Sequence, residues 1–298
     1  MVRLTRLLAT KATARALLTL VPGMIGTSAV AEAAEPKPWQ LGLQPPATPV
    51  MDRLWDFHDE LLIITTLIAA FVLGLLVYVM WRFNNQRNPL PSRTSHNTVI
   101  EMLWTVVPVL ILISIAIPSF KLMYYMDRVP NPEMTIKVTG HQWYWSYEYP
   151  DQGGLAFDSN IIPDDQLNPE QKRLLDVDNP LVVPADTIIR VLVTGTDVIH
   201  SWFMPSFGVQ EYAIVGRLNE SWMKIEPPGT YYGQCNQICG VNHAFMPIKV
   251  EAIPKDAFQR WLVDAKKKFA RHDDGTGAVH VAAVPDPADA AHSAPIGN

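Results

Sequence analysis

The sequence is poor in cysteine and in charged residues. Its 298 residues include only two cysteines, which excludes a scaffold held together by many disulfides. Charged residues make up 18% of the chain, below the roughly 25% of an average soluble domain. No block of basic residues marks a nucleic-acid surface, and no C-x-x-C-H motif marks a covalently attached haem. We therefore expect neither nucleic acid nor haem on this chain.

Residues 1–34 have the pattern of a secretory signal peptide. A basic start is followed by an apolar stretch and then by small residues with two overlapping A-x-A patterns. A short membrane anchor is the alternative, but Pro22, Gly23 and Gly26 interrupt a stretch already too short to span a bilayer. We predict cleavage near residues 32–35 and an exported N-terminal segment over residues 35–60.

Two longer apolar segments have the length of membrane-spanning helices. Residues 61–81 and 102–120 carry no charged side chain, and as helices they would be about 31 and 28 Å long. Buried core helices are the alternative, but two such runs in succession favour a transmembrane hairpin over residues 61–120. Its few polar residues predict a docking surface for a larger membrane subunit.

The charges around the hairpin predict its orientation. The loop between the two apolar segments carries three arginines between residues 82 and 93, with no acid before Glu101. Residues 52–60, ahead of the first segment, carry four acidic residues and one arginine. The basic loop should face the cytoplasm, so the N-terminus and everything after residue 121 should face the opposite side.

The region after the hairpin has the pattern of an all-β domain. Strands are predicted over residues 135–149, 181–183, 187–194, 221–226 and 247–253, with turns at 184–186 and 227–229. Short strands at this spacing predict a sandwich or small barrel. An amphipathic helix should follow over residues 255–272, with Phe258, Trp261, Leu262 and Ala265 on one face. Residues 273–298 have the composition of a disordered tail.

The most specific motif in the sequence is a set of cysteine, histidine and methionine residues with the spacing of metal ligands. Cys235, Cys239, His243 and Met246 have the spacing C-x3-C-x3-H-x2-M, and His200 lies in an earlier His-Ser-Trp segment. Soft sulfur ligands together with imidazoles favour copper over hard cations. A single blue-copper site needs only one cysteine, whereas two thiolates can each bridge two ions. The residues therefore predict a dinuclear copper centre, suited to electron transfer.

Simpler interpretations compete with copper. Two cysteines in an exported protein more often form a disulfide, but a disulfide does not need the histidine and methionine that follow. A zinc site of two cysteines and two histidines would leave Met246 without a role. Taken singly, Met246 and His200 are ordinary core residues. The complete set favours copper.

These motifs resemble subunit II of the haem–copper cytochrome c oxidases. The copper loop, the His-Ser-Trp segment and the aromatic run over residues 140–149 carry the resemblance, which covers roughly residues 50–265. It implies a two-helix transmembrane hairpin plus an all-β, cupredoxin-like Greek-key barrel, the CuA domain, over residues 121–254. It also implies a bacterial inner membrane, with the copper domain in the periplasm. There the CuA centre would pass electrons from cytochrome c to haem in subunit I of a proton-pumping oxidase.

The resemblance assigns roles to individual residues. The copper ligands would be His200, Cys235, Cys239, His243, Met246 and the backbone carbonyl of Gln237. The family usually has glutamate at position 237, whose carboxylate also reaches a magnesium ion shared with subunit I. The amide of Gln237 is a weaker ligand for that hard cation, which puts the magnesium role in doubt but leaves the copper role intact.

Two further residues and an acidic surface gain roles by resemblance. Trp143 matches the tryptophan through which electrons enter, with core packing as the alternative. Glu101 marks the entrance of a proton path, with an ordinary interfacial carboxylate as the alternative. Residues 132–254 carry 15 acidic and seven basic residues, a net charge of −8, which would steer a basic cytochrome c unless it serves only solubility. The candidate docking acids are Glu148, Asp151, Asp158, Asp164 and Asp165.

Three other functions are weighed against the oxidase. A membrane-anchored copper carrier needs an open, exchangeable site, whereas this ligand set is nearly closed. A quinol oxidase subunit II lacks these ligands. A nitrous-oxide reductase shares the copper loop, but the two-helix hairpin and Glu101 favour the oxidase.

Overall fold

The computed structural model describes residues 34–269. The predicted tail, the last three residues of the predicted C-terminal helix and, apart from Ala34, the predicted signal peptide lie outside the described residues.

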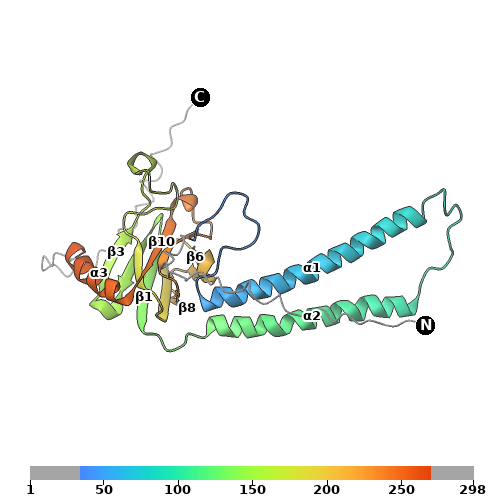
Figure 1. The fold of residues 1–298 in the computed structure, drawn as a ribbon, viewed down its shortest axis with the longest axis horizontal. Helices are drawn as coiled ribbons and strands as arrows, with labels where there is room; N and C mark the ends of the chain where they lie inside the picture. The colour runs from blue at the N-terminus through green and yellow to red at the C-terminus, as the bar shows by residue number, and fades with distance from the viewer. Residues whose placement is uncertain (1–33, 270–298) are drawn as a thin grey trace, which may run out of the picture.

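Two long helices lie side by side and project from a β domain (Figure 1). They are α1, Pro49–Arg82, and α2, Thr98–Asp127, and both are long and apolar enough to cross a membrane. Each begins at a side-chain cap, because Thr48 accepts a hydrogen bond from Met51 N at 3.1 Å and Asn97 accepts one from Val99 N at 3.1 Å. The predicted pair of spanning helices is confirmed, and each helix continues beyond its uncharged segment.

The β domain consists of two five-stranded sheets. The first has the order β3-β2-β1-β5-β8, with strands at Leu155–Ser159, Tyr144–Tyr149, Met134–His141, Ile189–Gly195 and Asn219–Met223. The second has the order β4-β10-β9-β6-β7, with strands at Leu181–Pro184, Pro247–Ile253, Gly229–Cys235, His200–Met204 and Val209–Ala213. The pairs β1–β5 and β4–β10 are parallel, and the other ladders are antiparallel. The predicted fold class, a two-helix hairpin plus an all-β, cupredoxin-like domain, is confirmed.

The core lies between the two sheets and is closed by a helix at one end. Alternate residues of β1 and β5 are buried, as expected for strands with one face toward a core. Helix α3, Lys255–Lys268, lies on the side of the domain away from the hairpin (Figure 1). Its predicted apolar face is confirmed, with Phe258, Leu262 and Ala265 buried and Trp261 packed against the core.

The strand predicted over residues 135–149 is wrong as a single strand. It is a hairpin of β1 and β2, in which His141 lies opposite Tyr144, so Gln142 and Trp143 form the turn. Trp143 therefore does not alternate along one strand with Trp145. Trp145 is fully buried in the core, and Trp143 lies half-buried at the turn.

Four strands were not predicted, and their sequences explain why. The sequences of strands β3 (LAFDS) and β7 (VQEYA) do not alternate between apolar and polar residues. Strand β6 is buried at four of its five positions, so it shows no alternation of apolar and polar residues. Strand β9 contains two glycines, at positions 229 and 233, which lower its apparent strand propensity.

The start of α1 is tied to the β domain by buried contacts. The hydroxyl of Thr48 donates to the Phe207 carbonyl at 2.7 Å, and Ala47 N donates to the Ser206 carbonyl at 2.9 Å. At the end of α2, the Trp222 indole donates to the Met126 carbonyl at 3.1 Å. These contacts hold the β domain against the ends of both helices, while the loop between the helices lies at the far end of the hairpin (Figure 1).

Candidate metal centre

The ends of two neighbouring strands bring the predicted metal ligands together. His200 begins β6, and Cys235 ends β9. The two strands are antiparallel neighbours, with Trp202 opposite Cys235, so His200 and Cys235 lie near the same end of the second sheet. The loop from β9 to β10 carries Cys239, His243 and Met246 back to the same place.

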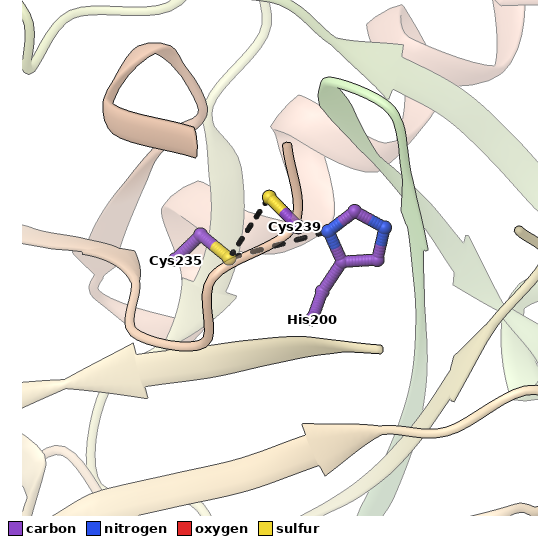
Figure 2. A group of neighbouring side chains, drawn as sticks. All are labelled: His200, Cys235 and Cys239. Atoms are coloured by element: carbon purple, nitrogen blue, oxygen red, sulfur yellow. Dashed lines mark hydrogen bonds between the residues drawn. The ribbon is translucent and has the colours of Figure 1, made fainter. Parts of the chain in front are cut away.

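The donor atoms of these residues converge, as Figure 2 shows for His200, Cys235 and Cys239. The Sγ atoms of Cys235 and Cys239 are 3.8 Å apart, and both cysteines are free of any disulfide. His200 Nδ1 lies 4.0 Å from Cys235 Sγ, and His243 Nδ1 lies 3.5 Å from Cys239 Sγ. Met246 Sδ is 3.5 Å from Cys239 Sγ, and the Gln237 carbonyl oxygen is 3.3 Å from Cys235 Sγ.

The site is largely buried, and its two thiols differ in how readily they ionise. Both cysteines, His200 and Met246 are buried, and His243 is half-buried. Burial opposes ionisation of Cys235, but hydrogen bonds from His200 and from the backbone outweigh it and lower the pKa of this thiol. Burial and the neighbouring charge of Cys235 raise the pKa of Cys239. A second thiolate at this site therefore needs a compensating cation.

The chemistry of the donor set fits copper. Two thiols, two imidazoles and a thioether are soft or borderline ligands, and hard cations such as Mg²⁺ prefer oxygen. The five side chains and one carbonyl at this site exceed the four ligands of a structural zinc ion.

A ring of hydrogen bonds around the ligands involves residues that sequence reasoning missed. Asp197 Oδ1 lies 2.8 Å from His200 Nε2, and Asp197 Oδ2 accepts from Gln142 N at 2.6 Å. The side-chain Nε2 of Gln142 and the indole Nε1 of Trp143 both donate to the Cys239 carbonyl, at 2.9 and 3.2 Å. An acid three residues before a predicted histidine ligand was the available signal for Asp197. Gln142 had no signal beyond its place beside Trp143.

Two glycines allow the close packing of this site. A Cβ atom on Gly140 would lie 2.9 Å from His200 Cδ2. Gly240 has a φ of +122°, and a Cβ atom there would lie 2.9 Å from Trp143 Cζ2. A larger residue at position 140 would displace the ring of His200, and one at position 240 would displace the ring of Trp143.

Glu101 is far from this site, because it lies in the first turn of α2 and that helix ends, not begins, at the β domain (Figure 1). Its Oε1 accepts from Asn97 N at 3.1 Å. That contact belongs to a reciprocal cap, because the Asn97 side chain also accepts from the helix backbone.

Four of the five candidate docking acids form ion pairs or hydrogen bonds with other residues of the β domain. Glu148 pairs with Lys137 at 3.2 Å, and Asp164 pairs with Arg173 at 2.8 Å. Asp151 accepts from Thr135 N, and Asp158 accepts from the Ser146 hydroxyl. Asp165 is exposed. The two ion pairs lower the local charge at Glu148 and Asp164, and their basic partners are already counted in the net charge of −8.

The chain is similar to known proteins along both of its parts. The family model described as cytochrome c oxidase subunit II, periplasmic domain, matches residues 134–253, and that of the transmembrane domain matches residues 36–122. A probable cytochrome c oxidase subunit 2 of Rickettsia bellii is 48% identical, over 86% of this chain and 95% of that protein. Cytochrome c oxidase subunit 2 of Zea mays is 50% identical, over 83% of this chain and 96% of that protein.

A solved structure is also similar to the β domain. It is the periplasmic domain of subunit II of cytochrome oxidase (CoxB) of Bradyrhizobium japonicum, with 52% sequence identity and a TM-score of 0.45. The match covers 48% of this chain and 99% of that one.

Proposed function

The chain belongs to the cytochrome c oxidase subunit II family, and we propose that it is the subunit through which electrons enter that oxidase. As a member of this family, it is an integral membrane subunit of a copper-containing oxidase complex. The observation that carries the proposal is the convergence of two free thiols with His200, His243 and Met246 in a buried site.

The proposed centre would hold two copper ions, for which Cys235 and Cys239 would supply thiolate ligands. Its ligands are His200, Cys235, Cys239, His243, Met246 and the carbonyl of Gln237. When bound, the copper pair supplies a one-electron carrier between cytochrome c and the haem of subunit I. The neutral amide of Gln237 argues against a magnesium site at this position.

The role of this chain's residues is to keep the site rigid and dry. Three backbone hydrogen bonds fix the ligand loop: Cys235 N to Met246 O, Asn236 N to Ser201 O and His243 N to Gly240 O, at 3.3, 3.2 and 3.2 Å. Ligands held in this way move little when the charge of the metal changes. A rigid, water-excluded site favours electron transfer over bond-making.

Trp143 is the proposed point where electrons reach the centre. Its half-buried ring lies at the turn between β1 and β2. Its indole N–H donates a hydrogen bond to the carbonyl of Cys239, one of the proposed ligands. This contact supports a short path from the surface to the site. Trp145, by contrast, is fully buried and fits the alternative of core packing.

The proposed setting is the bacterial inner membrane, with the copper domain in the periplasm. The N-terminal segment and the β domain lie at the same end of the hairpin, which supports placing both on one side of the membrane (Figure 1). The arginine-containing loop lies at the other end, which supports a cytoplasmic loop. In this setting Glu101 lies at the cytoplasmic end of α2, where a proton path into subunit I would begin.

The division of the chain into functional segments is part of the same proposal. The signal peptide over residues 1–34 would be removed, and residues 35–60 would lead into the hairpin over 61–120. The CuA domain over 121–254 would carry the copper centre, followed by the helix over 255–272 and the tail over 273–298.

Copper content and spectroscopy of the purified full-length chain test the proposal. We expect two copper ions per chain that resist a chelator, with the optical and EPR signals of a thiolate-bridged pair. Cys235→Ser should abolish these signals in the purified chain and abolish turnover in the assembled oxidase complex. Ser201→Ala is the matched control, because it removes a buried hydroxyl beside His200 that has no hydrogen-bond partner within residues 34–269. We expect this control variant to keep both the signals and turnover.

The same measurement separates the oxidase subunit from a copper carrier. One readily exchanged copper ion per chain would favour the carrier. Normal turnover in Cys235→Ser, or a disulfide between the two cysteines in the working complex, would contradict the proposed centre.

A further inference from the structure

Asp197 lies in the loop between β5 and β6 and uses both of its carboxylate oxygens. Oδ1 lies 2.8 Å from His200 Nε2 and accepts from Val198 N at 2.6 Å. Oδ2 accepts from Gln142 N at 2.6 Å. The side chain is 31% exposed, whereas the side chain of His200 is fully buried. One carboxylate thus joins a buried ligand to the turn between β1 and β2.

The His200 ring is held on several sides. Its Nδ1 faces Cys235 Sγ at 4.0 Å, and its Nε2 faces Asp197. Gly140 leaves no room for a Cβ atom against this ring, and the Trp145 ring lies edge-on at a centroid distance of 6.0 Å. A carboxylate on Nε2 places the ring proton there and leaves the lone pair of Nδ1 directed toward the cysteine pair.

Through its contact with Gln142, Asp197 also influences the position of Cys239, a second proposed ligand. The Gln142 side chain and the Trp143 indole both donate to the carbonyl of Cys239. Asp197 holds the backbone of the turn that presents these two donors. Moving the carboxylate would therefore disturb the surroundings of both His200 and Cys239.

We propose that Asp197 is a positioning residue of the metal centre. It orients His200 and clamps the Gln142–Trp143 turn against the cysteine loop. This inference rests on the proposed copper centre and adds to it a residue that does not bind the metal. An anionic partner makes an imidazole a stronger donor and stabilises the more highly charged state of the metal. Loss of the carboxylate should therefore weaken copper binding and raise the midpoint potential.

The test compares variants of the full-length chain for midpoint potential, EPR spectrum and loss of copper to a chelator. Asp197→Asn should raise the midpoint potential, alter the copper hyperfine pattern and weaken copper binding by about 10- to 100-fold. Asp197→Glu keeps the charge and should restore a potential close to that of the unmodified chain. Asp178→Asn is the matched control, because Asp178 is an exposed aspartate that accepts a backbone hydrogen bond from Asn160 at 2.8 Å.

The outcomes separate this inference from the proposed function. An unmodified chain without a two-copper signal would overturn the proposed function itself. If that chain has the signal and Asp197→Asn has the same potential, spectrum and copper retention, only the positioning role is wrong. The positioning role is also wrong if Asp197→Asn leaves these three properties unchanged and, in the assembled oxidase complex, alters only the KM for cytochrome c, because that result would assign Asp197 to docking. If Asp197→Asn does not fold, a strongly shifted potential in Asp197→Glu would contradict the role.

Discussion

At the scale of single residues, the pKa values of the two cysteines explain why a bound cation would stabilise this site. Cys235 loses its proton more readily than an ordinary thiol, because hydrogen bonds from His200 and the backbone outweigh the cost of burial. Cys239 holds its proton more tightly, because it is buried and lies beside the charge of Cys235. The pair can carry two negative charges only when a metal compensates them, so metal binding and release of the second proton are coupled.

Trp143→Phe tests the role of the indole at the same scale. The change keeps an aromatic ring in place but removes the N–H that donates to Cys239 O. We expect slower electron uptake from reduced cytochrome c with unchanged copper content, measured by stopped-flow kinetics. Trp261→Phe, on α3 at the far side of the domain, should have the unmodified rate (Figure 1). An unmodified rate in Trp143→Phe would remove this residue from the electron path.

Gly240→Ala tests how tightly the ligand loop must pack. Alanine at a φ of +122° is strained, which should cost about 1–3 kcal/mol of stability. The added Cβ would also lie 2.9 Å from the Trp143 ring, so copper retention should fall as well. Gly216→Ala is the control, because its φ is +75° with open space around the Cβ position. It should lose stability in chemical unfolding but retain copper; equal copper retention in the two variants would contradict the packing argument.

At the scale of elements, the start of α1 links the membrane hairpin to the copper domain. Thr48 caps the helix with its side-chain oxygen and donates the same hydroxyl to the buried Phe207 carbonyl. Phe207 in turn packs against Tyr231 of β9, the strand that ends at Cys235. The position of the β domain relative to the hairpin therefore depends in part on this buried junction, together with the contact of Trp222 with Met126 at the end of α2.

Thr48→Val should weaken that junction. The change keeps the shape of the side chain but removes both the cap and the hydrogen bond to a buried carbonyl, at a cost of about 1–3 kcal/mol. Thermal unfolding of the purified chain, followed by loss of the copper bands, should occur at a lower temperature. Thr105→Val, which removes an exposed hydroxyl within α2, should leave the midpoint nearly unchanged. Equal midpoints for the two variants would show that the junction does not limit stability.

At the scale of the whole molecule, charge is distributed unevenly between the two ends of the hairpin. The β domain carries a net charge of −8 over residues 132–254, and the loop at the far end carries arginines. An acidic surface attracts a basic partner over distances of about a Debye length. Because Glu148 and Asp164 are already paired with basic residues, we expect steering to come from the net charge more than from any single acid.

The salt dependence of electron uptake tests this view. The second-order rate with a basic cytochrome c should fall by roughly tenfold or more from low to high ionic strength. Stopped-flow mixing of the oxidase complex with reduced cytochrome c measures this rate. Transfer between the copper centre and haem within the complex is the internal control and should not depend on salt. A flat response of the second-order rate would remove the electrostatic part of docking.

Much of this protein could be predicted from its sequence, because the relevant signals are local. Two uncharged runs determined the membrane helices, since a bilayer selects for length and hydropathy alone. Apolar spacing determined the buried face of α3. The motif from Cys235 to Met246 places four of the proposed ligands on one loop, so its chemistry could be predicted without knowledge of the fold.

Only the tertiary structure decided how distant segments meet. It divided residues 135–149 into two strands and so placed Gln142 and Trp143 at a turn over the Cys239 carbonyl. It also brought the Asp197 carboxylate to the backbone N–H of Gln142. Hydrogen bonds between residues 50 to 100 positions apart leave no periodic trace in a sequence, because they depend on strand pairing and not on spacing along the chain.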